Sequence, residues 1–520
     1  MTTRRADRAV ALAAVVTSAA LSAITTFAPT TALLLAGLCL ALVALKSAIA
    51  AGYGFLYIGL LSLQTDGGLD ARKAALLAVV AILLLHTLSS QGGARSYKST
   101  TLIALVAVTL GGMVAIAYAS PPLTIAREIV PYLLLALSPI LGEYVGKYQV
   151  RETFAWCGIV CAGIASSAFF AYRWIEGRGL DQTPNAQVSI GLPSPLLASL
   201  ALAWCASSIA FRGRWWTIVP SALVVSGLAI SGTRAAVVSL VAFVVPFLLA
   251  GLRGVRRLFS AILLAGALAA ALTYSLIDTL NLDSDVLFER YSTLASPGQL
   301  SSDDDSIADR KAAQEIAWGY VRERALLGSG IGHEFYVGQR IPTAHSQRSA
   351  DLDTPLEFVA TFGLLGSVLW LIAAGRYSAA LFRTAPDDDV RATALGFGLT
   401  VAATSLIVNP ASDKGLSLAV FCLTVLSSFR AHAKEKRDQE DSLLQPRRSG
   451  RPPFGPKHLL HGKGILGIRR GSAWATPRTG NPQTASDHTV AIRRPSVEEP
   501  PIPNRERARS LRQSHRLTQT

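Results

Sequence analysis

Charged side chains are scarce in this chain. Asp, Glu, Lys and Arg make up 16% of the 520 residues, whereas apolar residues make up 51% and the mean hydropathy is positive. An average soluble domain carries about 25% charged residues. The scarcity of charge therefore excludes an ordinary soluble protein of this length and predicts a chain that crosses a membrane many times.

Cysteine is missing from the one long polar stretch within the first 430 residues, which runs from Asp278 to about Asp353. The polar stretch therefore has no disulfide to brace it and no zinc-type ligand spacing. We interpret the cysteines as small apolar packing residues, because all five lie in apolar runs: Cys39, Cys157, Cys161, Cys205 and Cys422.

Apolar runs of helix length fill most of residues 1–430. A bilayer core needs about 20 apolar residues per helix, and fewer when polar flanks reach the headgroups. The runs predict an all-α polytopic transmembrane protein with about 12 to 14 spans. The fourteen candidates are Val10–Phe27, Thr30–Leu45, Ser47–Leu63, Ala74–Leu88, Thr100–Ala119, Ile129–Val145, Thr153–Tyr172, Ser194–Phe211, Trp215–Ile230, Ala235–Leu252, Leu258–Ile277, Leu356–Ala374, Ala392–Val408 and Leu416–Phe429.

The spans divide the chain into four parts. Residues 1–277 hold about eleven spans, residues 278–354 form a large extracytoplasmic loop with short helices, residues 355–430 hold about three spans, and residues 431–520 form a basic tail. The tail carries 18 Lys/Arg against 8 Asp/Glu, which is +10 of the net charge of +15. Because it lacks periodic apolar residues, we expect it to be disordered. It either contacts anionic inner-leaflet lipids or is simply solvated, and the second interpretation is the simpler.

The positive charges between the spans predict the orientation. With a cytoplasmic N-terminus, the inside loops hold sixteen Lys/Arg and the short outside loops hold seven. The excess follows the positive-inside rule for an inner or plasma membrane protein. We therefore expect both termini in the cytoplasm and the polar loop outside.

Arg234 ends the sequence Ser231-Gly232-Thr233-Arg234, a break of small residues between two apolar runs at the predicted outer face. A guanidinium offers five donors in a planar fork, which suits a phosphate group. The small neighbours would let a lipid diphosphate approach the backbone. A guanidinium that only reaches the lipid headgroups explains the residue equally well.

Three other charged residues lie at predicted helix ends. We interpret Arg127 and Glu128 at an outer end as an ion pair, and Glu143 near an inner end as an interfacial residue.

The polar loop shows two local patterns. Ser306-x-x-Asp309 predicts an N-terminal cap before a helix from Arg310 to Leu326. The run Leu327-Gly328-Ser329-Gly330-Ile331-Gly332 then predicts a tight turn whose backbone N–H groups face an anion.

Histidine is also scarce, and only His86, His333 and His345 precede the tail. His86 lies near a predicted inner helix end, and we interpret it as structural. The other two lie in the outer loop, where an imidazole can accept the proton of an acceptor hydroxyl. His345 lies about ten residues before the next span, which favours it over His333 as the base.

Together these features resemble the O-antigen ligase and polymerase superfamily of bacterial membrane glycosyltransferases. The similar stretch runs from about Val219 to Ala374 and carries, in order, the element ending in Arg234, Arg310 ahead of a helix with Trp318, the glycine-rich turn, Ala344-His345, and the helix opening Glu357-x-x-x-x-Phe362-Gly363-Leu364-Leu365-Gly366.

The resemblance implies a reaction at the outer face of the membrane. Family members pass a glycan from an undecaprenyl-diphosphate carrier to an acceptor hydroxyl, without a cofactor, a sugar nucleotide or a catalytic metal. It implies that Arg234 and Arg310 bind the diphosphate and that His345 is the catalytic base. The implied partners are the lipid-linked glycan donor, a glycan, lipid or other hydroxyl acceptor, and membrane lipids, with no nucleic acid.

Two departures from the family pattern concern the base. The family often has Asn after the histidine where this chain has Ser346, and the distance from His345 to Gly363 is longer. Asp351 and Asp353 lie in the extra stretch, so either carboxylate is a candidate to share or replace the role of His345.

Other functions compete with a ligase that transfers a finished glycan. A polymerase that extends repeat units would share the donor, site and fold. A secondary transporter is disfavoured because we find no inverted repeat and no matched broken helices. A non-catalytic scaffold would keep the spans and make Arg234, Arg310 and His345 dispensable.

Overall fold

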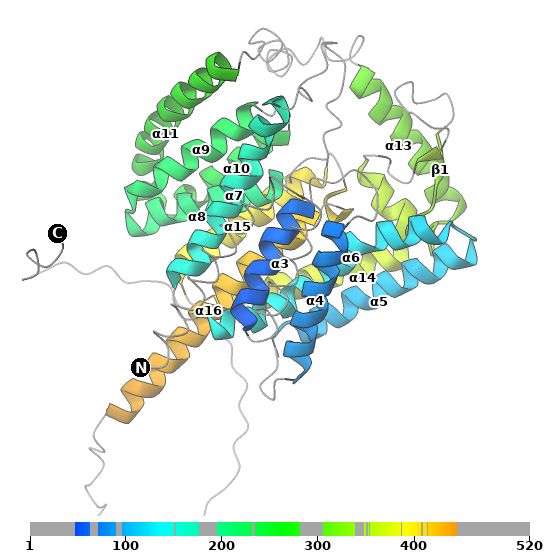
Figure 1. Ribbon diagram of the computed structural model, residues 1–520, viewed down its shortest axis with the longest axis horizontal. Coiled ribbons are helices and arrows are strands. Elements are labelled where there is room, and N and C mark those ends of the chain that lie inside the picture. The colour runs from blue at the N-terminus through cyan, green and yellow to red at the C-terminus, as the bar shows by residue number, and fades with distance from the viewer. Residues whose placement is uncertain are drawn as a thin grey trace, which may run out of the picture. The chain divides into compact units, whose positions relative to one another are not determined.

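A computed structural model describes thirteen stretches of the chain: residues 47–62, 71–89, 96–149, 152–175, 195–230, 235–280, 305–337, 348–349, 352, 354–385, 387–406, 409–412 and 414–444. Helices dominate them (Figure 1). In order, the elements are α3 (Ala48–Ser62), α4 (Ala71–Ser89), α5 (Lys98–Ala117), α6 (Pro122–Tyr148), α7 (Glu152–Ile175), α8 (Pro195–Arg212), η1 (Trp215–Thr217), α9 (Ile218–Ile230), α10 (Ala235–Leu249), α11 (Gly251–Leu280), α13 (Asp305–Glu323), β1 (Phe335–Tyr336), β2 (Arg348–Ser349), α14 (Pro355–Thr384), α15 (Asp388–Thr404), η3 (Pro410–Ser412) and α16 (Lys414–Leu444).

The predicted all-α membrane fold is confirmed. Among the described residues, six helices are long and apolar enough to cross a membrane, and five shorter apolar helices accompany them. Helices suit this role because a bilayer offers no water to satisfy backbone N–H and C=O groups. The six long segments are Lys98–Ala117, Pro122–Tyr148, Pro195–Arg212, Gly251–Ser275, Pro355–Thr384 and Gly415–Asp441.

Several helices extend beyond the predicted boundaries, and α13 and α16 change an interpretation. The helix of the polar loop, α13, begins at Asp305, so Ser306 lies inside its first turn and the predicted cap at Ser306 is wrong. Helix α16 runs on to Leu444 and continues past Ala431, the predicted start of the tail. The predicted span ended at Phe429 because apolar content marks only the membrane-buried part of a helix. It does not show whether the helix continues as a polar extension.

Helix α8 is the central helix of the largest core. Every residue from Leu196 to Ala210 is buried, and α7, α9, α10 and α15 pack around it. Its many Ala and Ser side chains allow neighbours to approach closely. At Gly163 of α7, an added Cβ would lie 2.3 Å from Ala201 Cβ, so a larger residue would push the two helices apart.

Helices α6 and α16 cross closely at two glycines. A Cβ at Gly142 would lie 2.7 Å from the carbonyl oxygen of Phe421, and one at Gly146 would lie 2.7 Å from that of Val425. The spacing is the small-xxx-small pattern that brings membrane helices together. Nearby, Glu143 is 3% exposed and accepts the N–H groups of Ser96 and Tyr97, so it satisfies the start of α5.

A second core joins α5, α6 and α14. The rings of Tyr132 and Phe362 meet edge to face with centroids 4.9 Å apart, and Trp370 packs against both. Ile331, from the glycine-rich turn, is fully buried in the same cluster. This core therefore connects the spans to the polar loop.

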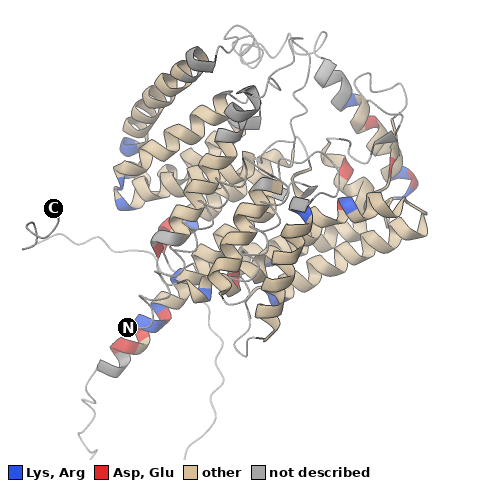
Figure 2. Cartoon of the chain, viewed as in Figure 1, with Lys and Arg blue, Asp and Glu red and all other residues tan. Residues whose placement is uncertain are grey.

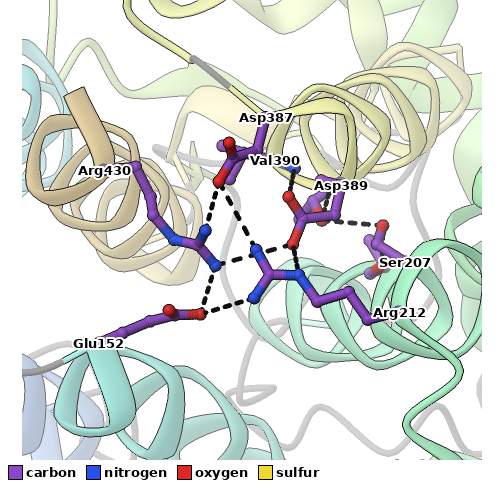
Figure 3. Close-up of polar contacts among 9 residues, drawn as sticks. Glu152, Ser207, Arg212, Asp387, Asp389, Val390 and Arg430 are labelled. Atoms are coloured by element: carbon purple, nitrogen blue, oxygen red, sulfur yellow. Dashed lines mark hydrogen bonds and ion pairs between the residues drawn. The ribbon is translucent and has the colours of Figure 1, made fainter. Parts of the chain in front are cut away.

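Five charged side chains tie four helices together at the end of the bundle from which α16 extends (Figure 3). They are Glu152 of α7, Arg212 of α8, Asp387 and Asp389 at the start of α15, and Arg430 of α16. Arg212 Nη1 lies 3.2 Å from Glu152 and its Nε lies 2.7 Å from Asp389. Arg430 pairs with both Glu152 and Asp387. We call this group the ion cluster.

Candidate functional site

Helix α13 presents one apolar face to the protein. Its residues Ala313, Ile316, Ala317 and Val321 recur at helical spacing and are buried. They form a small core, completed by Phe335 and Val337 around β1, Leu352, and Ala360 of α14. The polar loop is therefore packed onto the start of α14 between residues 305 and 337.

The glycine-rich turn after α13 reaches down the side of α5. The N–H of Ile331 donates to the carbonyl oxygen of Gly111 at 3.1 Å. Gly111 lies six residues before the end of α5, which is about 9 Å along the helix. At Gly330 (φ +87°) an added Cβ would lie 2.3 Å from the Ala115 nitrogen, so only glycine fits against α5.

Helix α14 is broken where this turn meets it. Gly363 has φ 63° and ψ −175°, a backbone conformation almost restricted to glycine. Two carbonyls before the break, of Ala360 and Thr361, accept the N–H groups of Ser329 (2.8 Å) and Gly330 (2.9 Å). After it, the N–H groups of Leu364 and Leu365 donate to the carbonyls of Ala325 (2.8 Å) and Leu326 (3.1 Å), respectively.

The turn and the broken helix therefore exchange hydrogen bonds. A break in a helix leaves backbone N–H and C=O groups without their usual partners inside the helix. Here the turn region supplies those partners to α14, so the backbone groups named above are satisfied. The prediction that the turn offers its N–H groups to an anion is wrong, because those of Ser329, Gly330 and Ile331 already bond to carbonyls. The turn has a structural role. We call the contact between the turn, residues 327–332, and the break in α14 at Gly363 the joint.

His333 follows the joint and lies in an aromatic group. Its ring packs edge to face against Tyr320 and Phe335, with both centroids 5.3 Å away. The neighbouring Glu334 accepts a hydrogen bond from the Thr124 hydroxyl at 3.2 Å, which ties the loop to the start of α6. This surrounding gives His333 a packing role, whichever residue is the base.

Glu357, the first residue of the helix-opening motif, is a buried carboxylate to which the sequence assigned no role. It is 4% exposed in the first turn of α14, and its Oε2 accepts the Leu352 N–H at 3.3 Å. Leu352 lies between Asp351 and Asp353 in the sequence, and this hydrogen bond holds Leu352 at the start of α14. The signals in the sequence were its place in that motif and an acidic residue at the opening of an apolar helix.

Two arginines near the joint rest on aromatic rings. The guanidinium carbon of Arg324 lies 4.0 Å from the ring centroid of Tyr118, in the connection between α5 and α6, and that of Arg322 lies 5.3 Å from the Trp318 ring. Cation–π contacts of this kind hold a guanidinium in place.

Arg127 and Glu128 form the predicted ion pair at 2.7 Å.

Most of the predicted site residues lie outside the described residues. These are Arg234, His345, Asp351 and Asp353. Arg310 belongs to α13, but its side chain is likewise outside the description. The roles of all five therefore remain predictions, and the structure supplies the framework on either side of them.

The comparisons with known proteins bear on the same region. Residues 219–371 match the family model described as O-antigen ligase, which confirms the resemblance found between about Val219 and Ala374. The match begins in α9 and ends within α14, so it includes α13, the joint and Glu357. No curated protein matches the chain.

Proposed function

Because residues 219–371 form a domain of the O-antigen ligase type of membrane glycosyltransferase, we propose that the chain transfers a glycan from an undecaprenyl-diphosphate carrier to an acceptor hydroxyl at the outer face of the membrane. The acceptor oxygen attacks the anomeric carbon, the bond from that carbon to the diphosphate oxygen breaks, and undecaprenyl diphosphate leaves. The hydroxyl proton passes to a base on the protein.

The chain's own residues supply three functions in this proposal. Arg234 and Arg310 hold the diphosphate and stabilise the charge that develops on it as it leaves. His345 accepts the acceptor proton, with Asp351 or Asp353 as the alternative base. Held charge and an aligned acceptor are sufficient for this displacement, so the proposed reaction uses no metal.

The observation that carries the proposal is that the joint lies within the residues that match the family model. The matched stretch contains a polar segment that would otherwise be a flexible loop, yet its turn is bonded into α14 and against α5. Glu357 holds Leu352 at the same helix. A segment held at its turn and at Leu352 beside apolar spans suits a reaction between a lipid-bound donor and a water-borne acceptor, because catalytic groups must be held in place.

A transfer assay tests the proposal. The purified full-length protein in lipid vesicles is given a synthetic undecaprenyl-diphosphate glycan and an acceptor, and both transferred glycan and free undecaprenyl diphosphate are measured. We expect the two products in equal amounts. Glycan movement across the vesicle without bond cleavage would identify a transporter, and the absence of both events with every donor would support the scaffold.

The same assay separates a ligase from a polymerase. A polymerase forms longer chains from the donor alone, because a second donor serves as acceptor. A ligase requires the separate acceptor and gives one product length per donor. We propose the ligase-like reaction and keep polymerisation as the second candidate, since both use the same donor and site.

A further inference from the structure

An open groove of about 510 Å³ lies at the end of the bundle from which α16 extends. It is formed where α14 ends, α15 begins and α16 continues beyond the other helices. Its polar lining includes Arg383, Arg391 and Lys434, together with Glu435 and Asp438. Figure 2 shows charged residues of both signs at this end of the bundle, whereas the middles of the helices are almost free of charge.

The three cations of the groove are largely available. Among the described residues, neither Arg383 nor Lys434 forms an ion pair with a carboxylate, and Arg391 has only a loose one, 3.7 Å from the exposed Asp388. Arg391 Nε donates to the Ala385 carbonyl at 3.1 Å, which holds this side chain at the groove. Arg212 and Arg430 of the adjacent ion cluster differ from these cations, because three carboxylates neutralise them.

Exposed apolar side chains lie farther along the two helices whose ends form the groove. Ile372 lies eleven residues before Arg383, or about three turns, and therefore on the same face of α14. Leu395 lies one turn after Arg391 on α15. Both side chains are exposed, as lipid-facing side chains of membrane helices are. Cations at the end of two apolar faces match a phosphate at the end of two acyl chains.

We propose that this groove binds the headgroup of an anionic phospholipid of the glycerol type. Basic pockets between membrane helices bind anionic headgroups. Three cations and two carboxylates give the groove a formal charge of +1, which complements a lipid of charge −1. Arg383, Arg391 and Lys434 bind the phosphate, and Glu435 and Asp438 accept hydrogen bonds from the glycerol hydroxyls.

Lipid binding to the full-length protein tests the proposal. Nanodiscs are prepared with a phosphatidylcholine background and increasing phosphatidylglycerol, and the lipid retained after extraction is counted by native mass spectrometry. Each removed cation is expected to weaken retention about fivefold, the factor that corresponds to about 1 kcal/mol per surface Lys or Arg. The double variant Arg383→Gln/Arg391→Gln should therefore retain phosphatidylglycerol about 25-fold more weakly.

Matched controls make the result specific. Arg253→Gln/Arg256→Gln removes the same charge from exposed positions of α11 outside the groove, and it should retain the lipid as the unmodified protein does. If the double variant does not fold, Lys434→Gln on the exposed part of α16 replaces it, with an expected fivefold effect.

Three outcomes would overturn the proposal. Equal loss of retention in the control variant would mean a general effect of charge. Equal retention of phosphatidylethanolamine would mean that the groove does not select an anionic lipid. Equally tight binding of free glycerol phosphate would make the groove a site for a soluble phosphate ester. None of these outcomes depends on glycan transfer.

Discussion

At the scale of single residues, Arg234 is the most specific prediction for donor binding. It follows Ser231, Gly232 and Thr233 between α9 and α10, so two helices fix the ends of this short break. We expect Arg234→Ala to abolish glycan transfer while the protein still inserts. Arg234→Lys should not restore full activity, because an ammonium cannot form the two parallel hydrogen bonds of a guanidinium fork with a phosphate.

Arg310→Ala should weaken use of the donor in a similar way. Exposed Arg322→Ala on the same helix is the matched control, and it should leave transfer unchanged. Activity is compared at equal abundance in the membrane. Normal transfer by both the Arg234 and the Arg310 variants would rule out the proposed diphosphate site.

His345 is the residue we expect to act as the base. Removal of a general base slows a reaction by about 10²–10⁴-fold, so His345→Ala should lose nearly all transfer. In the unmodified protein, transfer should fall as the pH is lowered through the range in which imidazole becomes protonated, because a protonated ring cannot accept the hydroxyl proton. Initial rates between pH 5 and 8 measure this.

His333→Ala is the comparison for the base assignment. It removes a ring that packs on Tyr320 and Phe335, so it should affect stability more than the pH profile of transfer. An active His345→Ala protein together with an inactive Asp351→Asn or Asp353→Asn protein would assign the base to a carboxylate. Full activity in all of these variants would mean that none of these side chains is the base.

At the scale of elements, the sequence predicted the helices well and their connections poorly. Apolar runs located α8 and α10 to within a few residues, because hydropathy reports burial in lipid directly. The joint between the glycine-rich turn and α14 was not predictable in the same way. In the sequence, Gly328 looks like a turn residue and Gly363 looks like a residue inside a helix. No local pattern indicates that the backbones of the two residues meet.

In the candidate site, too, the sequence predicted some features and not others. The resemblance placed the family-like stretch at about Val219 to Ala374, close to the matched residues 219–371, since its motifs are short runs of particular residues. The sequence assigned no role to Glu357 or Arg324, because a single acid or cation at a helix end is common. Only the folded chain shows that one binds the Leu352 N–H and that the other lies on Tyr118.

The joint yields a prediction for Gly363→Ala. A non-glycine residue in this backbone conformation costs about 1–3 kcal/mol. The added Cβ would also lie 2.4 Å from the Gly328 nitrogen and from the Leu326 carbonyl oxygen. We therefore expect a lower thermal unfolding midpoint and reduced transfer, measured on detergent-solubilised protein. Gly375→Ala is the control on the same helix, since nothing lies within 4 Å of its Cβ position. Equal stability of the two variants would contradict the exchange of hydrogen bonds.

At the scale of the whole molecule, the ion cluster joins helices that are far apart in sequence. Arg430 is 12% exposed and pairs with Glu152 of α7 and with Asp387 before α15. Arg430→Ala would leave three carboxylates around Arg212 alone. Loss of charge-assisted hydrogen bonds costs about 1.5–3 kcal/mol each, so the unfolding midpoint should fall clearly. Arg437→Ala, at an exposed position of the same helix, should not change it.

The orientation of the molecule is the prediction on which the proposed site depends. The excess of Lys and Arg in alternate loops predicts that residues 278–353 are external and that both termini are cytoplasmic. Ser302→Cys should therefore react with a membrane-impermeant maleimide added outside intact cells. Ser449→Cys should react only after the cells are opened. The unsubstituted protein, whose five cysteines all lie in apolar runs, provides the background.

The two labelling positions test different parts of the proposal. Labelling of Ser302→Cys only from the cytoplasm would place Arg310 and His345 on the side opposite to the proposed donor, and the transferase proposal would fail with it. Labelling of both positions from outside would instead leave the site in place and change the number of spans after the loop from odd to even. The predicted spans Leu356–Ala374, Ala392–Val408 and Leu416–Phe429 give three, and α14 and α16 contain segments that are long and apolar enough to cross a membrane. The lipid groove would then face the cytoplasmic leaflet, on the opposite side of the membrane from the candidate catalytic site.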